Sequence, residues 1–154
     1  MSHVSLIAAD KELPLCGKRE YRESTVTVPD NEHFTIGFAC GFAVEEHSYY
    51  RDSTDLLNYE MKPFRYELSL EQCETDLNHL LTYLRENFSP GEAVELWSLW
   101  VGGGHGEHPI HYRGRLSEFD LDTLGMLTEL PKEPDLTGEY PDGLFSQICI
   151  TVEV

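Results

Sequence analysis

Residues 71–101 read EQCETDLNHLLTYLRENFSPGEAVELWSLWV, and this stretch decides the fold. Its first half repeats apolar residues at helical spacing, which is typical of a helix that buries one face. Acidic residues begin this half and Arg85 lies near its end, as the helix dipole favours. Ser89-Pro90-Gly91 then interrupts it. We predict a helix from about Glu71 to Asn87, with an apolar stripe of Cys73, Leu77, Leu80, Leu81, Leu84 and Phe88.

The second half, VELWSLWV at 94–101, is predicted to be a strand in the middle of a sheet. Successive side chains of a strand point to opposite faces, and here both faces are apolar. Leu96 and Trp100 belong to one face, and Trp97, Leu99 and Val101 to the other.

Further elements are predicted on both sides of this stretch. Alternating apolar residues indicate strands, and a short helix fits within 48–59. Asp120 or Ser117 is suited to cap a second helix that carries Leu121, Leu124, Leu127 and Leu130. Loops are expected at 102–109 and 131–143. The predicted strands are 4–8, 24–28, 34–44 with a bulge or bend at Gly37 and Gly41, 64–70, 110–115 and 145–154.

These elements predict a single α+β domain over residues 1–154. Its sheet is expected to be mixed and mostly antiparallel, with two or three helices packed mainly on one face. We expect strands 64–70 and 94–101 to pair in parallel through a crossover helix. The terminal strand 145–154 is expected at an open edge, where it could support a homodimer.

Acidity restricts the partners of the chain. It has 28 Asp and Glu against 11 Lys and Arg, a formal net charge of -17 over 154 residues. Such a charge opposes binding to nucleic acid and to anionic membranes. It favours a solvated surface or a face that binds a basic protein. An anionic face would also accelerate encounter with such a partner by roughly 10–1,000-fold.

Cysteine usage and the N-terminus favour a cytoplasmic protein. The four cysteines are widely spaced and form no C-x-x-C pair, so free thiols are expected. Residues 1–4 do not begin a secretory signal. The apolar run 34–44 has 11 residues, whereas a membrane-spanning helix needs about 20.

A histidine-rich loop is the strongest candidate for chemistry. His105, His108 and His111 follow an H-x-x-H-x-x-H pattern, with Glu107 among them. Three histidines and a water would suit a divalent transition metal such as zinc, with Glu107 as a base. The pattern differs from H-E-x-x-H on a helix, and three glycines precede it. The alternative is a polar loop whose histidines bind nothing, in which case no cofactor is expected.

Two aromatic pairs are candidates for an interface. They are Trp97 with Trp100 and Tyr49 with Tyr50. Tryptophan and tyrosine are enriched at binding hot spots, although packing in the core or at its rim explains both pairs equally well.

Other catalytic patterns are weaker. Pro29-Asp30 with Glu60-Met61-Lys62 resembles the PD-(D/E)xK nuclease motif, which implies acids that hold Mg²⁺ and an assisting lysine. The net charge opposes a nuclease. Cys73 and His79 are too far around one helix to form a dyad, which leaves only pairs between distant segments.

No catalytic residue is assigned by these observations. The first hypothesis is a non-enzymatic acidic protein-interaction domain that binds a basic protein, in the manner of an inhibitor or an immunity protein. The alternative is a metal-binding module or metal-dependent hydrolase that uses His105, His108 and His111.

Overall fold

The computed structural model describes residues 2–27, 29, 32–102, 108–128 and 146–154. Its strands form one large sheet and one separate hairpin. The strands are β1 (Ser2–Ala9), β2 (Cys16–Gly17), β3 (Glu20–Thr27), β4 (His33–Cys40), β5 (Ala43–Glu46), β6 (Phe64–Ser69), β7 (Ala93–Val101), β8 (Ile110–Arg115) and β9 (Ile148–Glu153). The helices are α1 (Arg51–Asp55), α2 (Glu74–Asn87) and α3 (Leu121–Gly125), and a 3₁₀ turn spans Leu116–Glu118.

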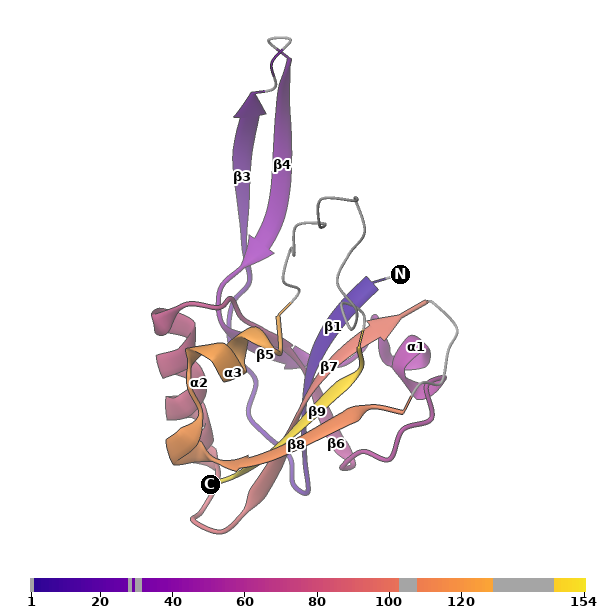
Figure 1. The fold of residues 1–154 in the computed structure, drawn as a ribbon, viewed down its shortest axis with the longest axis vertical. Coiled ribbons are helices and arrows are strands. Elements are labelled where there is room, and N and C mark those ends of the chain that lie inside the picture. Colours follow the sequence, from indigo (N-terminus) through magenta and orange to yellow (C-terminus); the bar gives the residue numbers. More distant parts are fainter. Residues whose placement is uncertain (1, 28, 30–31, 103–107, 129–145) are drawn as a thin grey trace.

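The seven-stranded sheet has the order β2-β5-β6-β1-β7-β9-β8 (Figure 1). Among the described strands, only β8 and β9 pair in parallel, so the predicted mixed, mostly antiparallel α+β fold is confirmed. The predicted parallel pairing of 64–70 with 94–101 is wrong, because β1 lies between β6 and β7 and pairs antiparallel with both. The predicted open edge at 145–154 is also wrong, since β9 pairs with β7 on one side and β8 on the other.

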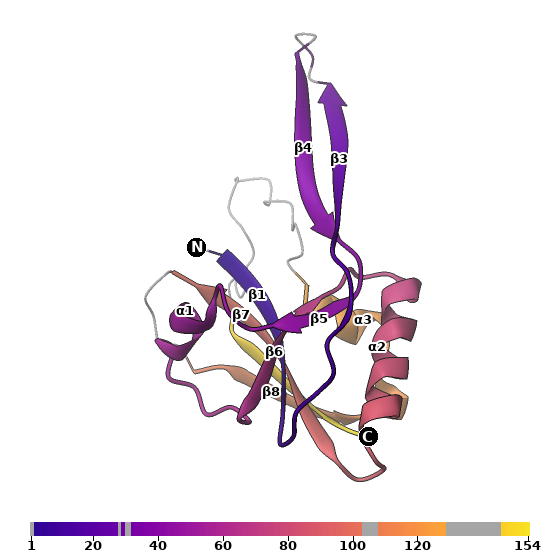
Figure 2. The same cartoon turned by 180° about the vertical axis from the view of Figure 1, so that it is seen from behind.

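The β3–β4 hairpin, which we call the arm, stands away from the body of the molecule (Figures 1 and 2). The single strand predicted over 34–44 is in fact two strands that belong to different sheets. The chain turns between them at Gly41, whose φ of +103° is a conformation that side chains with a Cβ rarely adopt. The predicted bend at this glycine is therefore the junction between the arm and the body.

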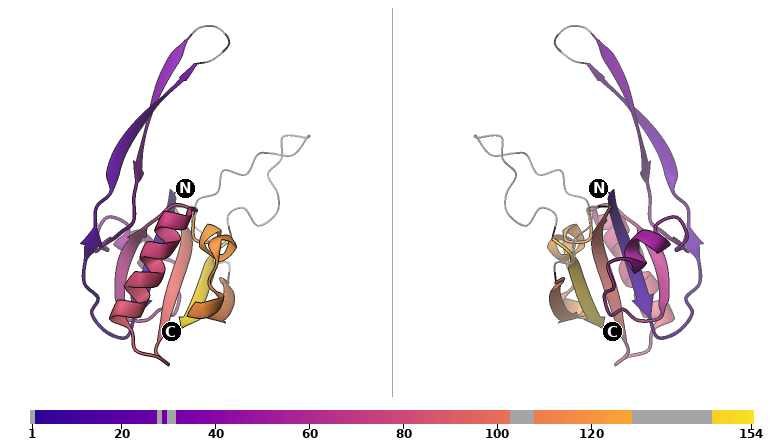
Figure 3. Two further views of the ribbon diagram at one scale, coloured as in Figure 1. Left: turned by 90° about the vertical axis from the view of Figure 1, so that its left-hand side faces the viewer. Right: turned by 90° about the vertical axis from the view of Figure 1, so that its right-hand side faces the viewer.

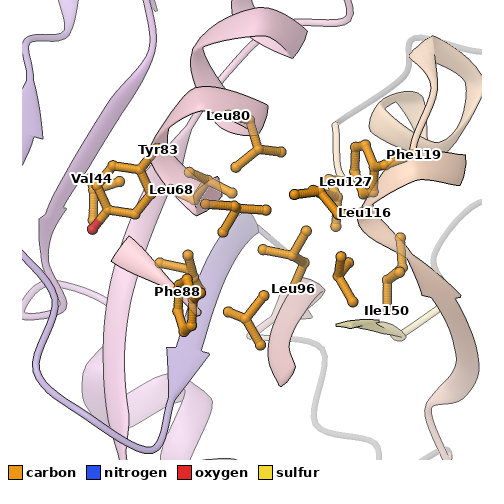
Figure 4. Packing of buried hydrophobic residues seen from close by; sticks show 14 of the residues in the cluster. Val44, Leu68, Leu80, Tyr83, Phe88, Leu96, Leu116, Phe119, Leu127 and Ile150 are labelled. Atoms are coloured by element: carbon orange, nitrogen blue, oxygen red, sulfur yellow. The ribbon is translucent and has the colours of Figure 1, made fainter. Parts of the chain in front are cut away.

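The main core lies between the sheet and the helices α2 and α3 (Figure 4). Every third or fourth residue of α2 faces the sheet, which is why the helical stripe in the sequence is buried. Leu80 and Leu84 are fully buried, and Leu96 of β7 and Ile150 of β9 lie on the sheet side of the same cluster. Burying a leucine side chain contributes about 1.5–3 kcal/mol, so this face supplies most of the apolar stabilisation.

A smaller apolar cluster lies on the opposite face of the sheet, where α1 is found (Figure 3). Leu6, Trp97 and Leu99 are fully buried there. Tyr59 and Met61, from the segment that joins α1 to β6, pack against them. The apolar residues on both faces of β7 are thus explained, because it is a central strand with a core on either side.

The helices α1 and α3 are short. Asp120 caps α3 as predicted, since its carboxylate accepts a hydrogen bond from the backbone N–H of Thr123 at 2.9 Å. Leu124 and Leu127 of the predicted apolar set are buried, whereas Leu130 lies outside the described residues. None of the helices within the described ranges is long and apolar enough to cross a membrane.

Candidate functional site

An open pocket of about 650 Å³ lies on the face of the sheet that carries α1. Neighbouring parts of the sheet supply one side of it, and the segment between α1 and β6 supplies the other. The pocket is lined by Asp10, Asn58, Tyr59, Glu60, Met61, Lys62, Pro63, Glu95, Trp97, His108, Pro109 and His111.

Three aromatic rings meet at the buried Trp97. The ring of Tyr59 is nearly parallel to the indole, with centroids 6.0 Å apart and planes at 9°. The imidazole of His111 meets the indole edge-on, also at 6.0 Å. Strand pairing produces this cluster, because His111 is in register with Cys149 of β9, and Cys149 in turn with Trp97 of β7.

Hydrogen bonds hold the carboxylate of Glu95 beside these rings. Its Oε1 accepts the backbone N–H of Lys62 at 2.7 Å and the indole N–H of Trp97 at 3.4 Å. The ammonium of Lys62 in turn pairs with the carboxylate of Asp10. Asp10, Glu60 and Glu95 against Lys62 give the lining a formal charge of -2 when the histidines are neutral. The pocket therefore combines aromatic surface with excess negative charge.

The structure describes two of the three predicted metal ligands. His108 and His111 both line the pocket, and His105 and Glu107 lie outside the described residues. Within the described ranges, Glu71, Cys73 and Asp76 are the one group of three such residues whose ligand atoms lie within 4.8 Å of one another. Metal binding by the histidine loop thus stays a prediction.

The Glu71, Cys73 and Asp76 group is explained by the start of α2. The carboxylate of Asp76 accepts the backbone N–H of Glu71 at 2.7 Å and so satisfies a donor that precedes the helix. This arrangement fixes the chain just before the helix, and nothing else in the described residues points to an ion there.

The predicted interface residues occupy different environments. Trp97 is fully buried and belongs to the lining of the pocket, whereas Trp100 is half-buried with its ring 5.1 Å from that of His3. Tyr49 is 83% exposed and meets the half-buried Tyr50 edge-on at 4.8 Å. Of the four, Tyr49 offers the most surface to a partner, and the interface stays a prediction.

A buried polar cluster connects α1 to the sheet beside the pocket. His47 Nε2 lies 2.8 Å from the hydroxyl of Thr54, and His47 Nδ1 lies 3.3 Å from the carboxylate of Glu67. All three residues are buried. Arg19 is 3.8 Å from Glu67 and 3.2 Å from Glu45, so it extends the cluster to the surface. These contacts satisfy buried polar groups and position α1.

Two of the described cysteines, Cys16 and Cys149, are unsuited to act as nucleophiles. Cys16, Cys73 and Cys149 are free thiols. Burial, together with the nearby carboxylate of Glu95, raises the pKa of Cys149 to about 12. Burial also raises the pKa of Cys16. Because the thiolate is the reactive form, both thiols are inert near neutral pH.

Sequence reasoning did not assemble the pocket. Glu95 is the one charged residue of a strand that is apolar on both faces, and that exception could have identified it. In the sequence, Glu60 and Lys62 belong only to a nuclease-like motif, whose Asp30 lies outside the described residues. Tyr59 and Asp10 carry no signal in the sequence, since only the folded chain brings them to Trp97.

Comparison with known proteins adds no relative. No protein-family model matches the chain, and no curated protein or solved structure matches it significantly.

Proposed function

We propose that the chain is a non-enzymatic acidic interaction domain that binds a basic protein, in the manner of an inhibitor or an immunity protein. The formal charge of -17 supports this proposal, because it attracts cationic proteins and repels polyanions. In this proposal the domain acts in the cytoplasm, where free thiols such as Cys16, Cys73 and Cys149 are the rule.

The arm is the observation that carries the proposal. Its two strands have eight residues each and pair only with each other (Figure 3). An isolated two-stranded hairpin is marginally stable in water. A surface supplied by a partner would therefore stabilise it.

The register of the arm divides its residues into two different faces. Tyr21, Thr25, Thr27 and Thr35 belong to one face and are exposed. By strand alternation, the other face carries the exposed ion pair of Glu20 and Arg22 near the body. Its remaining positions are mostly apolar in the sequence, namely Val26, Phe34, Ile36 and Phe38. An arm with apolar positions that projects from an acidic body is suited to contact a protein. Burial of apolar side chains would supply affinity, and charge attraction would raise the association rate.

Removal of the arm gives a sharp experiment. A Cβ on Gly41 would lie 3.0 Å from the carbonyl oxygen of Lys18, so the two ends of the arm are adjacent. Residues 20–40 can therefore be replaced by a short Gly-Ser link without opening the sheet. The intact and armless chains would each be used to capture proteins from the native cell extract at low and high salt.

The captured partner would then be purified and titrated against both chains at several salt concentrations. We expect the partner to be a basic protein whose affinity for the chain falls as salt screens the charges. We also expect the armless chain to bind it more weakly than the intact chain, although both chains melt at the same temperature. Salt-independent binding, or tight binding of DNA or RNA at near-physiological salt, would contradict the proposal. Measuring the molecular mass of the free chain in solution tests for a homodimer. In such a dimer the two copies would meet at β8, the long strand at one edge of the sheet.

A metal-binding module or metal-dependent hydrolase is the second candidate. What favours it is that His108 and His111 line one pocket together with Asp10, Glu60 and Glu95. Elemental analysis of the purified chain and melting curves with added Zn²⁺, Ni²⁺ or Fe²⁺ test this candidate. One equivalent of metal that is lost in His108→Ala would support this candidate. Finding no bound metal and no shift of the melting temperature would exclude it.

A further inference from the structure

We propose that the aromatic pocket around Trp97 binds the guanidinium group of an arginine side chain presented by the basic partner. This inference rests on the proposed function and assigns a recognition site to it. Three properties of the pocket support a guanidinium ligand: its charge, its aromatic surface and the spacing of its carboxylates.

The charge of the pocket favours a cation. Lys62 already places one ammonium in the lining, and Asp10 holds it. Both hydrogen bonds that position Glu95 end on Oε1, and in the described part of the chain no donor is bound to its Oε2. Glu60 is exposed on the same lining. A second cation would therefore find a carboxylate that is already oriented and half-buried.

The aromatic surface favours guanidinium over ammonium. Tyr59 lies nearly parallel to the fully buried Trp97, and His111 closes the cluster edge-on, so Tyr59 and His111 supply the aromatic surface that a ligand can reach. A guanidinium is planar and weakly hydrated, so it stacks on aromatic rings while it donates to carboxylates. An ammonium is compact and strongly hydrated, so it loses more hydration in such a pocket.

The spacing of the acids and histidines disfavours a compact metal ion. Within the described residues, no three ligand atoms of the pocket's Asp, Glu and His side chains come within 4.8 Å of one another. A divalent transition metal needs ligand atoms about 2.0–2.3 Å from one centre. A guanidinium has five N–H donors in a wide fork and suits carboxylates that are farther apart.

Titration with small probes tests the pocket directly. N-acetyl-L-arginine amide and N-acetyl-L-lysine amide would be added to the full chain while the indole N–H signal of Trp97 is followed by NMR. We expect the arginine probe to shift this signal and to bind at least about threefold more tightly than the lysine probe. Equal binding of the two probes, or no shift of the indole signal, would overturn the inference.

Matched variants separate the pocket from net charge. Glu95→Gln keeps an oxygen that accepts from Lys62 and Trp97 but removes the charge. Glu86→Gln removes the same charge from an exposed position on α2, on the opposite face of the sheet. We expect about three- to tenfold weaker binding of the arginine probe for Glu95→Gln alone. Equal losses in the two variants would overturn the inference, and melting curves would verify that both variants fold.

The captured partner distinguishes this inference from the proposed function. Weaker binding of that protein to Glu95→Gln than to Glu86→Gln supports an arginine carried by the partner. A partner that binds both variants equally overturns the pocket inference and leaves the proposed function standing. If the arginine probe binds but the intact chain captures no basic protein from the extract, the partner as the source of the arginine is overturned, and the proposed function with it.

Discussion

The side-chain amide of Gln147 hydrogen bonds to both backbone groups of Trp100. Its Oε1 accepts the Trp100 N–H at 2.7 Å, and its Nε2 donates to the Trp100 carbonyl oxygen at 2.8 Å. Gln147 is buried and immediately precedes β9. Its amide thus continues the pairing of β7 beyond Ser98, the last residue of β7 in register with β9.

Replacing this amide should destabilise the domain. Gln147→Leu leaves an N–H and a carbonyl of β7 without these partners, so we expect a loss of about 2 kcal/mol in the free energy of unfolding. Urea denaturation measures the loss. Gln72→Leu is the control, because Gln72 is exposed and should cost no more than about 0.5 kcal/mol. Similar values for the two variants would show that the amide contributes nothing specific.

The core between α2 and the sheet gives a second prediction. Leu80 is fully buried, whereas Leu56 beside α1 is 86% exposed. Leu80→Ala should cost about 2–5 kcal/mol, because it removes buried apolar surface and leaves a cavity. Leu56→Ala makes the same chemical change and should cost no more than about 0.5 kcal/mol. Thermal unfolding of both variants tests whether α2 packs as described, and a stable Leu80→Ala would contradict that packing.

The short pairing of β2 with β5 depends on the absence of a side chain. Gly17 has a φ of +71°, and a Cβ added there would lie 2.1 Å from the carbonyl oxygen of Phe42. Gly17→Ala should therefore cost about 2–4 kcal/mol through strain and displacement of β5. Gly114→Ala on β8 meets open space and should be nearly neutral. Chemical denaturation would compare the two, and a neutral Gly17→Ala would refute this backbone geometry.

Stability should fall in mild acid because of His3. Burial lowers the pKa of His3 from 6.5 to about 4. Above pH 6.5 the imidazole is neutral in both states and has no effect. Between pH 6.5 and 4 only the unfolded chain binds the proton, so stability falls as the pH falls, by about 2 kcal/mol at pH 5.

The variant His3→Gln isolates this effect from the many carboxylates. Its free energy of unfolding should depend less on pH than that of the natural chain between pH 7 and 5. The measurement is urea denaturation of both chains at each pH. Parallel pH curves would mean that His3 is not buried in its neutral form.

The spacing of apolar residues along the chain predicted those helices and strands whose buried faces follow a regular period. The stripe that includes Leu77, Leu80 and Leu84 predicted α2, and the two apolar faces of 94–101 predicted the central strand β7. Both signals arise because helix and strand periods determine which side chains are buried.

Long-range pairing was beyond the sequence. Alternation over 34–44 is the same whether the residues form one strand or two strands of different sheets, so the arm was missed. Nothing in 145–154 indicates that β8 covers its outer side. The pocket could not be predicted for a related reason. Tyr59 and Lys62 come from a loop without periodicity and reach Glu95 only in the folded chain.

The separation of the arm from the seven-stranded sheet has an evolutionary consequence. No strand of the sheet pairs with β3 or β4, so substitutions along the arm do not disturb the pairing that holds the sheet together. Should the arm bind the partner as proposed, descendants of this chain can change their binding preferences by mutation of the hairpin while they inherit the scaffold unchanged.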